Sequence, residues 1–297
     1  MIGFDHVDKF ILKDIHLHIP SGMAVGLLGG QGAGKTTFLK LICGLLMPEK
    51  GIVQTMQGNP VRNRKQLGQS MGVFFPGCMH LIQDLSVREN FEQLKIIYDL
   101  DHHLFNADYA DIAQRLNFQD IENTKVKHLS MGQKRRIELA ATLIHRPKLL
   151  LLDEPIDHLD EVVKEALRDL LRERQAQGMT LIISSYNMDE ISQLCQRLIL
   201  LEKGEMLYYG DLSMLMKKYA PMEKMQLQLL DQMPDLEDLP FEKYSILEDQ
   251  FTLTYNANHV TAVEILSVLL KQSAFSKVSI KKSDLADVIL RLKGEDE

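Results

Sequence analysis

A glycine-rich segment near the N-terminus has the residue types that bind phosphate groups. Residues 29–36 read Gly-Gly-Gln-Gly-Ala-Gly-Lys-Thr and match the pattern GxxxxGK(S/T). Glycines let several backbone N–H groups point at one anion without a Cβ clash, and the helix that follows adds its positive end. We expect Lys35 to neutralise charge on the β- and γ-phosphates and the Thr36 hydroxyl to be a Mg²⁺ ligand. The nucleotide contacts expected from this loop are Gly29, Gly30, Gln31, Gly32, Ala33, Gly34, Lys35, Thr36 and Thr37.

A second group of chemistry-bearing residues follows the apolar run 149–152, where the chain continues with Asp153, Glu154 and Pro155. An aspartate at the carboxyl end of a buried strand is well placed to hold Mg²⁺ through water. The next residue, Glu154, can polarise the attacking water as a general base. An acidic pair after a strand is ordinarily a solvated loop. Its pairing with the phosphate-binding loop favours a role in nucleotide hydrolysis.

A third segment is more selective, because phosphate-binding loops also serve kinases, GTPases and helicases. Residues 129–133 read Leu-Ser-Met-Gly-Gln and begin 24 residues before Asp153. This segment resembles the LSGGQ signature of ABC transporter ATPases, with Met131 in place of a glycine. The resemblance implies that ATP and Mg²⁺ are bound between two subunits, with the signature of one subunit capping the γ-phosphate held by the other. The capping residues implied are Ser130, Gly132 and Gln133.

The segment 156–160, Ile-Asp-His-Leu-Asp, resembles the D-loop of the same family, which implies that Asp160 reaches across the interface between two ATPase subunits. The resemblance covers about residues 1–215. It implies an α/β P-loop NTPase domain with an inserted helical subdomain. It also implies a peripheral subunit at the cytoplasmic face of the cell membrane, with multi-span membrane permease subunits and a second ATPase subunit as partners.

Two positions depart from the family pattern. Tyr186 stands where the family usually has a switch histidine. A tyrosine can donate a neutral hydrogen bond, but it titrates near pH ~10 and is never a cation. Pro76 and Gly77 stand where the family has a glutamine that contacts magnesium and water, and Gln83 comes several residues later.

These departures bear on the rate of hydrolysis, because losing one preorganised donor at a charged transition state commonly costs ~10²–10³ in rate. We expect the site around Lys35 to bind Mg-ATP but to hydrolyse it slowly, while the signature completes a site on a sister ATPase. A working homodimer in which Tyr186 substitutes for the histidine is the alternative. The candidate catalytic residues are Glu154, Lys35 and Tyr186.

The base-contacting aromatic residue is less well defined. Phe10 lies nearest to the expected place, but the segment 9–12 is shorter than in the family. Two interpretations therefore remain for Phe10, a contact to the nucleotide base and a place in the hydrophobic core.

The elements that position these residues follow from the apolar pattern. Short apolar runs at 23–28, 149–152 and 180–185 predict buried strands, and the segments 35–46 and 161–177 have helical spacing. Strands and helices that alternate in this way predict an α/β domain with a parallel sheet.

The region of about residues 86–146 is predicted to be helical throughout. Ser86 and Glu89 have the spacing of a capping box, as do Ser130 and Gln133. Both boxes precede apolar residues at helical spacing, so the region predicts a helical subdomain inserted into the α/β domain.

Residues 216–297 predict a small α+β domain. Strands are expected at 225–230, 251–255 and 278–280, a loop at 231–240, and helices at 260–271 and 284–292. This part resembles the C-terminal extension of ATPases from bacterial drug, peptide or polysaccharide exporters. The resemblance implies export, and a regulatory or dimer-bracing role for the extension.

Composition limits the classes of partner. The 297 residues carry a formal net charge of −7, so we expect no nucleic-acid partner. The three scattered cysteines predict neither a disulfide framework nor a zinc site, and they fit a reducing compartment. No window approaches the ~20 apolar residues of a membrane-spanning helix.

A non-transport ABC protein that acts on ribosomes or DNA is the alternative function. Residues 157–160 are similar to a stretch of the ribosome-acting members. Those proteins usually carry two ATPase units and a basic linker, whereas this chain shows one unit and is acidic. A P-loop kinase is disfavoured by the signature.

Overall fold

A computed structural model describes residues 2–77, 81–157, 159–219, 222–230, 233–236, 239–247, 250–282 and 292. The chain forms two compact units, Met1–Gly210 and Asp211–Glu297. The predicted boundary at residue 215 falls within helix α8 (Leu212–Tyr219) of the second unit. None of the described helices is long and apolar enough to cross a membrane.

The first unit is built on a six-stranded sheet with the order β5-β6-β7-β3-β8-β9. Its strands are β5 (Met71–Phe74), β6 (Leu149–Asp153), β7 (Thr180–Ser185), β3 (Ala24–Leu28), β8 (Arg197–Glu202) and β9 (Glu205–Asp211). The pairs from β5 to β8 are parallel. Every residue of β3, β6 and β7 is buried, which explains why their sequences are apolar without alternation. The predicted strands at 149–152 and 180–185 are therefore confirmed.

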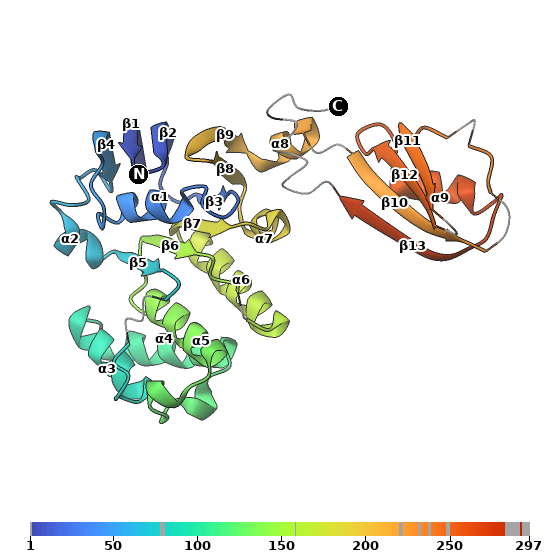
Figure 1. The fold of residues 1–297 in the computed structure, drawn as a ribbon. Helices are drawn as coiled ribbons and strands as arrows, with labels where there is room; N and C mark the ends of the chain where they lie inside the picture. The colour runs from blue at the N-terminus through green and yellow to red at the C-terminus, as the bar shows by residue number, and fades with distance from the viewer. Residues whose placement is uncertain are drawn as a thin grey trace. The chain divides into compact units, whose positions relative to one another are not determined.

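A second, antiparallel sheet with the order β2-β1-β4 covers helix α1 (Figure 1). It consists of β1 (Ile2–Lys9), β2 (Leu12–Ile19) and β4 (Lys50–Thr55). Helix α1 (Lys35–Ile42) packs between the two sheets, and the Phe38 ring stacks on Phe4 with 4.5 Å between centroids. The helix is shorter than the predicted 35–46, because the chain turns at Gly44 with a φ of +71°.

The other helices of the sheet domain are α2 (Arg64–Gly68), α6 (Glu161–Ala176) and α7 (Met188–Leu194). Helix α6 begins with Asp160 as its N-cap, whose side chain accepts a hydrogen bond from the Val163 N–H. The predicted helix at 161–177 is confirmed to within one residue. Helix α7 packs on β3, where Gly26 leaves room for Ile191.

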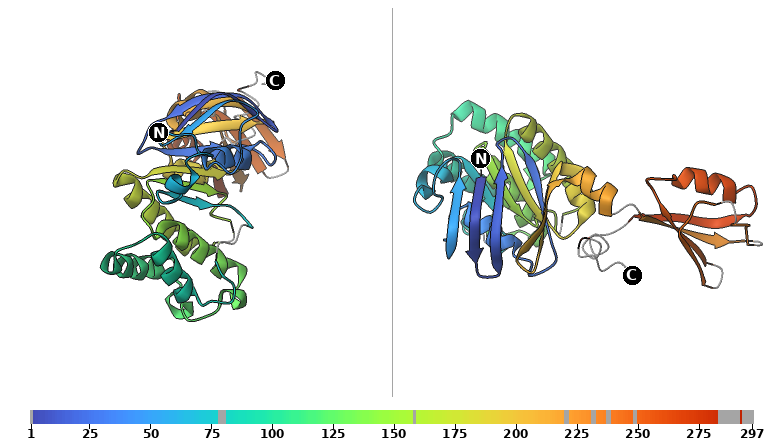
Figure 2. Two further views of the ribbon diagram at one scale, coloured as in Figure 1. Left: turned by 90° about the vertical axis from the view of Figure 1, so that its left-hand side faces the viewer. Right: turned by 90° about the horizontal axis from the view of Figure 1, so that it is seen from above.

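The inserted region contains α3 (Val87–Ile97), α4 (His102–Arg115) and α5 (Met131–Leu143), which lie together at one end of the first unit (Figures 1 and 2). Two 3₁₀ turns, Gln119–Ile121 and Val126–His128, connect α4 to α5. Both predicted capping boxes are present. Ser86 caps α3 together with Glu89, and Ser130 caps α5 together with Gln133.

The second unit is a four-stranded antiparallel sheet with the order β11-β12-β10-β13 and helix α9 (Ala262–Leu269). Its strands are β10 (Met222–Leu229), β11 (Lys243–Leu247), β12 (Gln250–Asn256) and β13 (Phe275–Lys282). Phe251, Leu253 and Tyr255 of β12 are fully buried in its own core. The predicted strands at 225–230, 251–255 and 278–280 and the helix at 260–271 correspond to β10, β12, β13 and α9. The predicted helix at 284–292 lies outside the described residues except for residue 292, as does part of the predicted loop at 231–240.

Candidate nucleotide-binding site

A cavity of about 740 Å³ lies at the carboxyl ends of neighbouring strands of the six-stranded sheet. The phosphate-binding loop follows β3, and Asp153 is the last residue of β6. Between them lies β7, where Ser184 is paired in register with Asp153. Parallel strands bring their carboxyl ends to one sheet edge, so segments more than a hundred residues apart meet there. The cavity is lined by every residue from Gly30 to Thr37 and by Ile11, Pro76, Asp153, Glu154 and Tyr186.

The glycines of the loop meet two different requirements. At Gly34 the φ is +105°, and a Cβ atom would lie 2.7 Å from Leu12 Cδ2. At Gly29 a Cβ atom would lie 2.4 Å from the carbonyl oxygen of Leu201. Gly30 and Gly32, by contrast, have open space where a Cβ would be, so their backbone is accessible to a ligand in the cavity. The loop is therefore packed against the fold at its two ends and open in its middle.

Lys35 is buried, and its ammonium group is held at the base of the cavity. Its Nζ donates to the carbonyl oxygen of Gly29 at 2.7 Å and lies 3.1 Å from Glu154 Oε1. A buried ammonium group needs partners of this kind, because an unpaired charge is expensive to remove from water. Lys35 is the one cationic side chain among the described residues that line the cavity, and it is fixed next to a carboxylate.

The Asp153 carboxylate accepts hydrogen bonds from two hydroxyl groups. Thr36 Oγ1 donates to Oδ2 at 2.6 Å, and Ser184 Oγ donates to Oδ1 at 2.5 Å. One hydroxyl and one carboxylate from different elements thus lie within bonding reach of each other, with oxygen atoms that suit Mg²⁺. The donor set fits the metal that the sequence predicts.

Glu154 has a strained backbone. Its φ is +47°, and its N–H donates to Ser184 Oγ at 3.1 Å. The guanidinium group of Arg135, from α5, donates to the carbonyl oxygens of Glu154 and Pro155 and stacks 4.3 Å above the Phe74 ring. Left-handed backbone at a non-glycine residue is found where surrounding contacts over-determine it, often at active sites. Burial raises the pKa of Glu154, while the nearby Lys35 acts in the opposite direction.

Tyr186 lines the cavity from the end of β7, with 58% of its surface exposed. Its hydroxyl donates to Asp157 Oδ1 at 3.3 Å. The negative charge of the Asp157 carboxylate raises the pKa of Tyr186 above its ordinary value. The side chain is therefore a neutral donor at neutral pH. Pro76 also lines the cavity, whereas Gln83 does not.

The interpretation of Phe10 as a core residue is wrong, because 68% of its surface is exposed. Phe10 is not among the residues that line the cavity either; its neighbour Ile11 is. Phe10 adopts a φ of +52° in the turn between β1 and β2, and Lys9 Nζ lies 4.4 Å above its ring. The turn therefore places an aliphatic side chain, that of Ile11, at the cavity wall in place of the expected aromatic ring.

The signature residues Ser130, Gly132 and Gln133 and the D-loop residue Asp160 do not line the cavity of their own chain. Ser130 caps α5, with its Oγ accepting from the Gln133 N–H at 3.3 Å, and Met131 beside it is 77% exposed. Asp160 forms an ion pair with Arg136 of the same chain at 2.6 Å. His158, which belongs to the same segment, lies outside the described residues.

Four residues near the site were not predicted from the sequence: Ile11, Arg135, Asp157 and Ser184. Ser184 had a usable signal, since it is the last residue but one of a buried strand and Asp153 ends another. The other three have no such signal, because their positions depend on how loops and α5 pack.

Comparison with known proteins decides the family. The sequence model described as "ABC transporter" matches residues 12–157. The ABC transporter ATP-binding protein NatA of Bacillus subtilis (strain 168) is 32% identical over 204 residues, which cover 69% of this chain and 83% of NatA. The chain belongs to the ABC transporter ATP-binding proteins.

Two further similarities describe this ABC ATPase. The Nod factor export ATP-binding protein I of Burkholderia pseudomallei (strain 1710b) is 30% identical over 291 residues, 97% of this chain and 94% of the relative. Among solved structures, "Dimeric Structure of MJ0796, a Bacterial ABC Transporter Cassette" matches with a TM-score of 0.63 and 25% identity, over 71% of this chain and 99% of that one. The α/β P-loop NTPase fold predicted from the sequence is therefore confirmed, and the protein is an ATP-binding, ATP-hydrolysing subunit.

Proposed function

We propose that this ABC ATPase powers export through separate membrane subunits, using ATP bound at the cavity above β3, β6 and β7. The Nod factor export relative matches almost the full length of both chains, including the second unit, and this supports export. The observation that carries the site assignment is the meeting of Lys35, Thr36, Asp153 and Glu154 in one cavity.

Each residue has a role that fits its position. The backbone from Gly30 to Gly34 receives the phosphates, Gly29 holds the Lys35 ammonium group through its carbonyl oxygen, and Lys35 neutralises the phosphate charge. Thr36 and Asp153 hold Mg²⁺, which supplies charge stabilisation on the phosphate oxygens when bound. Glu154 accepts the proton of the attacking water, a role favoured by its raised pKa. Thr37 lines the same cavity and contacts the nucleotide.

A second ATPase subunit supplies the cap of the site. Ser130, Gly132 and Gln133 stand at the start of α5 with an exposed neighbour, Met131, and away from the cavity of their own chain. A helix N-terminus favours anions, so this end of α5 suits the γ-phosphate held by another subunit. Asp160 belongs to the same interface. There its carboxylate would contact the second subunit, either in place of Arg136 or in addition to it.

The subunit pairs preferentially with a different ATPase, and its own site turns over slowly. Tyr186 offers one neutral hydrogen bond and is already engaged by Asp157. Pro76 lines the cavity where the family has a glutamine side chain, and a proline side chain has no hydrogen-bonding group. A homodimer in which Tyr186 suffices is the competing arrangement.

The membrane partner is a permease that this subunit meets at the cytoplasmic face of the cell membrane. Three large apolar side chains near the α3–α4 connection are highly exposed, Ile96 at 72%, Ile97 at 66% and Leu104 at 56%. Contiguous apolar surface of this kind marks protein interaction sites, and these three side chains lie close together in the sequence. A cytoplasmic segment of a permease would cover them.

A steady-state ATPase assay on the full chain with Mg²⁺ tests the slow-site proposal. We expect tight ATP binding, measured by equilibrium dialysis, together with slow phosphate release. Robust turnover that Glu154→Gln abolishes would sink the slow-site proposal and favour the homodimer. Failure to bind ATP at all would overturn the assignment of the cavity.

Co-purification tests the partners. The tagged chain should bring down a multi-span membrane protein and a second ATPase from detergent-solubilised membranes. Ile97→Glu should reduce the yield of the membrane protein, whereas Ile52→Glu, a change of an exposed isoleucine on β4, should not. Capture of ribosomal RNA instead would favour the alternative function.

A further inference from the structure

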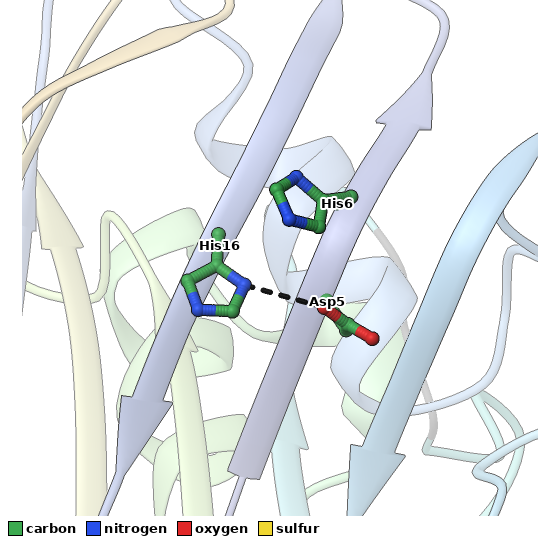
Figure 3. A group of neighbouring side chains, drawn as sticks. All are labelled: Asp5, His6 and His16. Atoms are coloured by element: carbon green, nitrogen blue, oxygen red, sulfur yellow. Dashed lines mark ion pairs between the residues drawn. The ribbon is translucent and has the colours of Figure 1, made fainter.

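Three side chains with metal-ligating atoms lie together on the antiparallel pair β1–β2. They are Asp5, His6 and His16 (Figure 3). Each offers one ligand atom, and these atoms all lie within 4.8 Å of one another. The three side chains are exposed, and none belongs to the residues that line the nucleotide cavity.

An irregularity in strand pairing brings the three together. Phe4 pairs with Leu17 and Val7 pairs with Ile15, so two residues of β1, Asp5 and His6, stand opposite the single residue His16. A bulge of this kind changes the direction of a side chain and is commonly a built feature of a fold. His6 itself adopts a φ of +47°. Its ring stacks on that of His16, with 5.0 Å between the centroids.

The neighbouring strand is shaped to accept the bulge. Gly51 of β4 has a φ of +76°, and a Cβ atom there would lie 2.3 Å from the carbonyl oxygens of both Asp5 and His6. Only glycine allows β4 to approach the bulged backbone so closely. The arrangement of Asp5 and His6 is therefore specified by residues of all three strands of the sheet.

His6 is oriented as metal-ligating histidines usually are. His6 Nδ1 lies 2.6 Å from Asp14 Oδ1, which leaves Nε2 as the ring nitrogen that would bind a metal ion. Metal-binding histidines almost always donate their other N–H group to a carboxylate or carbonyl, which fixes the tautomer and the ring. Asp14 is fixed in turn, because its own N–H donates to Asp8 Oδ1 at 2.7 Å.

The spacing of the ligand atoms suits a small cation. Asp5 Oδ1 lies 3.3 Å from His16 Nδ1 (Figure 3). Two ligands at about 2.0–2.1 Å from a tetrahedral zinc ion are separated by about 3.3–3.4 Å, so this pair already has the required separation. The His6 ring is exposed, and its ligand atom lies within 4.8 Å of those of Asp5 and His16, so a small movement of the ring brings it to the same separation.

We propose that Asp5, His6 and His16 bind a divalent transition-metal ion of the Zn²⁺ class, with Asp14 as the carboxylate that orients His6. Imidazole ligands select zinc, copper or nickel over magnesium, so this site is chemically distinct from the magnesium site at the nucleotide. The remaining coordination positions face solvent. A bound ion would join β1 to β2, whose connecting turn carries Ile11 to the nucleotide cavity.

Titration of the chelator-treated full chain with Zn²⁺ in an isothermal calorimeter, without nucleotide, tests the proposal. Co²⁺ provides a second probe, because its visible absorption reports tetrahedral coordination. We expect one ion per chain. His6→Ala and His16→Ala should each weaken binding at least about tenfold, and Asp14→Asn should weaken it about 10–100-fold through loss of orientation. His18→Ala is the matched control, since His18 is an exposed histidine on β2, the strand of His16, and lies outside the cluster.

Circular dichroism of each variant establishes that it is folded. The proposal is overturned if the folded wild-type chain takes up no Zn²⁺. It is also overturned if His6→Ala and His16→Ala bind the ion as the wild type does, or if His18→Ala weakens binding as much as they do. None of these outcomes depends on ATP binding or on the proposed export function.

Discussion

Lys35 Nζ lies 3.1 Å from Glu154 Oε1, and both side chains are largely shielded from solvent. The residue proposed to hold the phosphates and the residue proposed to activate water are therefore ion-paired with each other. A triphosphate offers Lys35 a more highly charged partner. Its binding would draw Lys35 away from Glu154 and leave the glutamate, with its raised pKa, free to accept a proton.

Replacing Lys35 with alanine should weaken ATP binding by about 10² or more, since truncating one member of a buried charge pair costs about 2–5 kcal/mol. The loss is increased because Glu154 would then face the phosphates without a compensating cation. Equilibrium dialysis with ATP measures the effect. Lys40→Ala is the control, because Lys40 is on the same helix but contacts Phe75 and does not line the cavity. Equal affinities for the two variants would contradict the role of Lys35.

Replacing Tyr186 with histidine should raise the rate of ATP hydrolysis by about tenfold or more, because a donor that can carry positive charge would face the γ-phosphate. Steady-state phosphate release at saturating ATP measures the effect. Tyr186→Phe keeps the ring and loses the hydroxyl that donates to Asp157, so it controls for changes in packing. A histidine variant no faster than the wild type would show that Tyr186 does not limit the rate.

Asp108 links α4 to two arginines that follow it in the chain. Arg146 donates to both of its carboxylate oxygens, at 2.6 and 2.8 Å, and Arg174 of α6 donates at 3.2 Å. Asp108→Ala should lower the free energy of unfolding by about 3 kcal/mol, because the buried Arg174 would lose its carboxylate. Urea denaturation measures the change. Asp111→Ala removes a more exposed partner of Arg115 and should cost about 0.5 kcal/mol or less. Similar losses in the two variants would contradict this account.

His145 should make the first unit less stable as the pH falls. Its ring is buried and stacked on Tyr98, and burial lowers its pKa to about 4. An unfolded histidine has a pKa of about 6.5, so between these values the unfolded chain binds one more proton than the folded chain. The free energy of unfolding should therefore fall by about 3 kcal/mol in total between about pH 6.5 and pH 4, because each pKa unit corresponds to about 1.4 kcal/mol.

Urea denaturation at pH 7, 6, 5 and 4 measures this dependence. Other groups also titrate in this range, so the comparison is with His145→Phe, which keeps an aromatic ring beside Tyr98 and removes the titrating group. Between about pH 6.5 and pH 4 the free energy of unfolding of the variant should fall by about 3 kcal/mol less than that of the wild type. Parallel declines in the two proteins would rule out His145 as the cause.

The sequence by itself determined the features that are local in the chain. Glycine spacing specifies the loop from Gly29 to Gly34, because the conformation depends on which residues lack a Cβ atom. Serine followed by Glu or Gln three residues later specifies both capping boxes. The apolar runs of β6 and β7 specify buried strands, because only a strand covered on both faces has no polar side. These signals sufficed to predict the fold class and the core of the nucleotide site.

The tertiary structure decided what depends on strand order and register. Ser184 reaches Asp153 only because β7 lies between β6 and β3, and Ile11 rather than Phe10 lines the cavity only because of how the β1–β2 turn is placed. The bulge that sets Asp5 and His6 opposite His16 has no sequence signal of its own. A shift of one residue in strand pairing would separate these side chains, and hydrophobic pattern alone does not resolve such shifts on an exposed face.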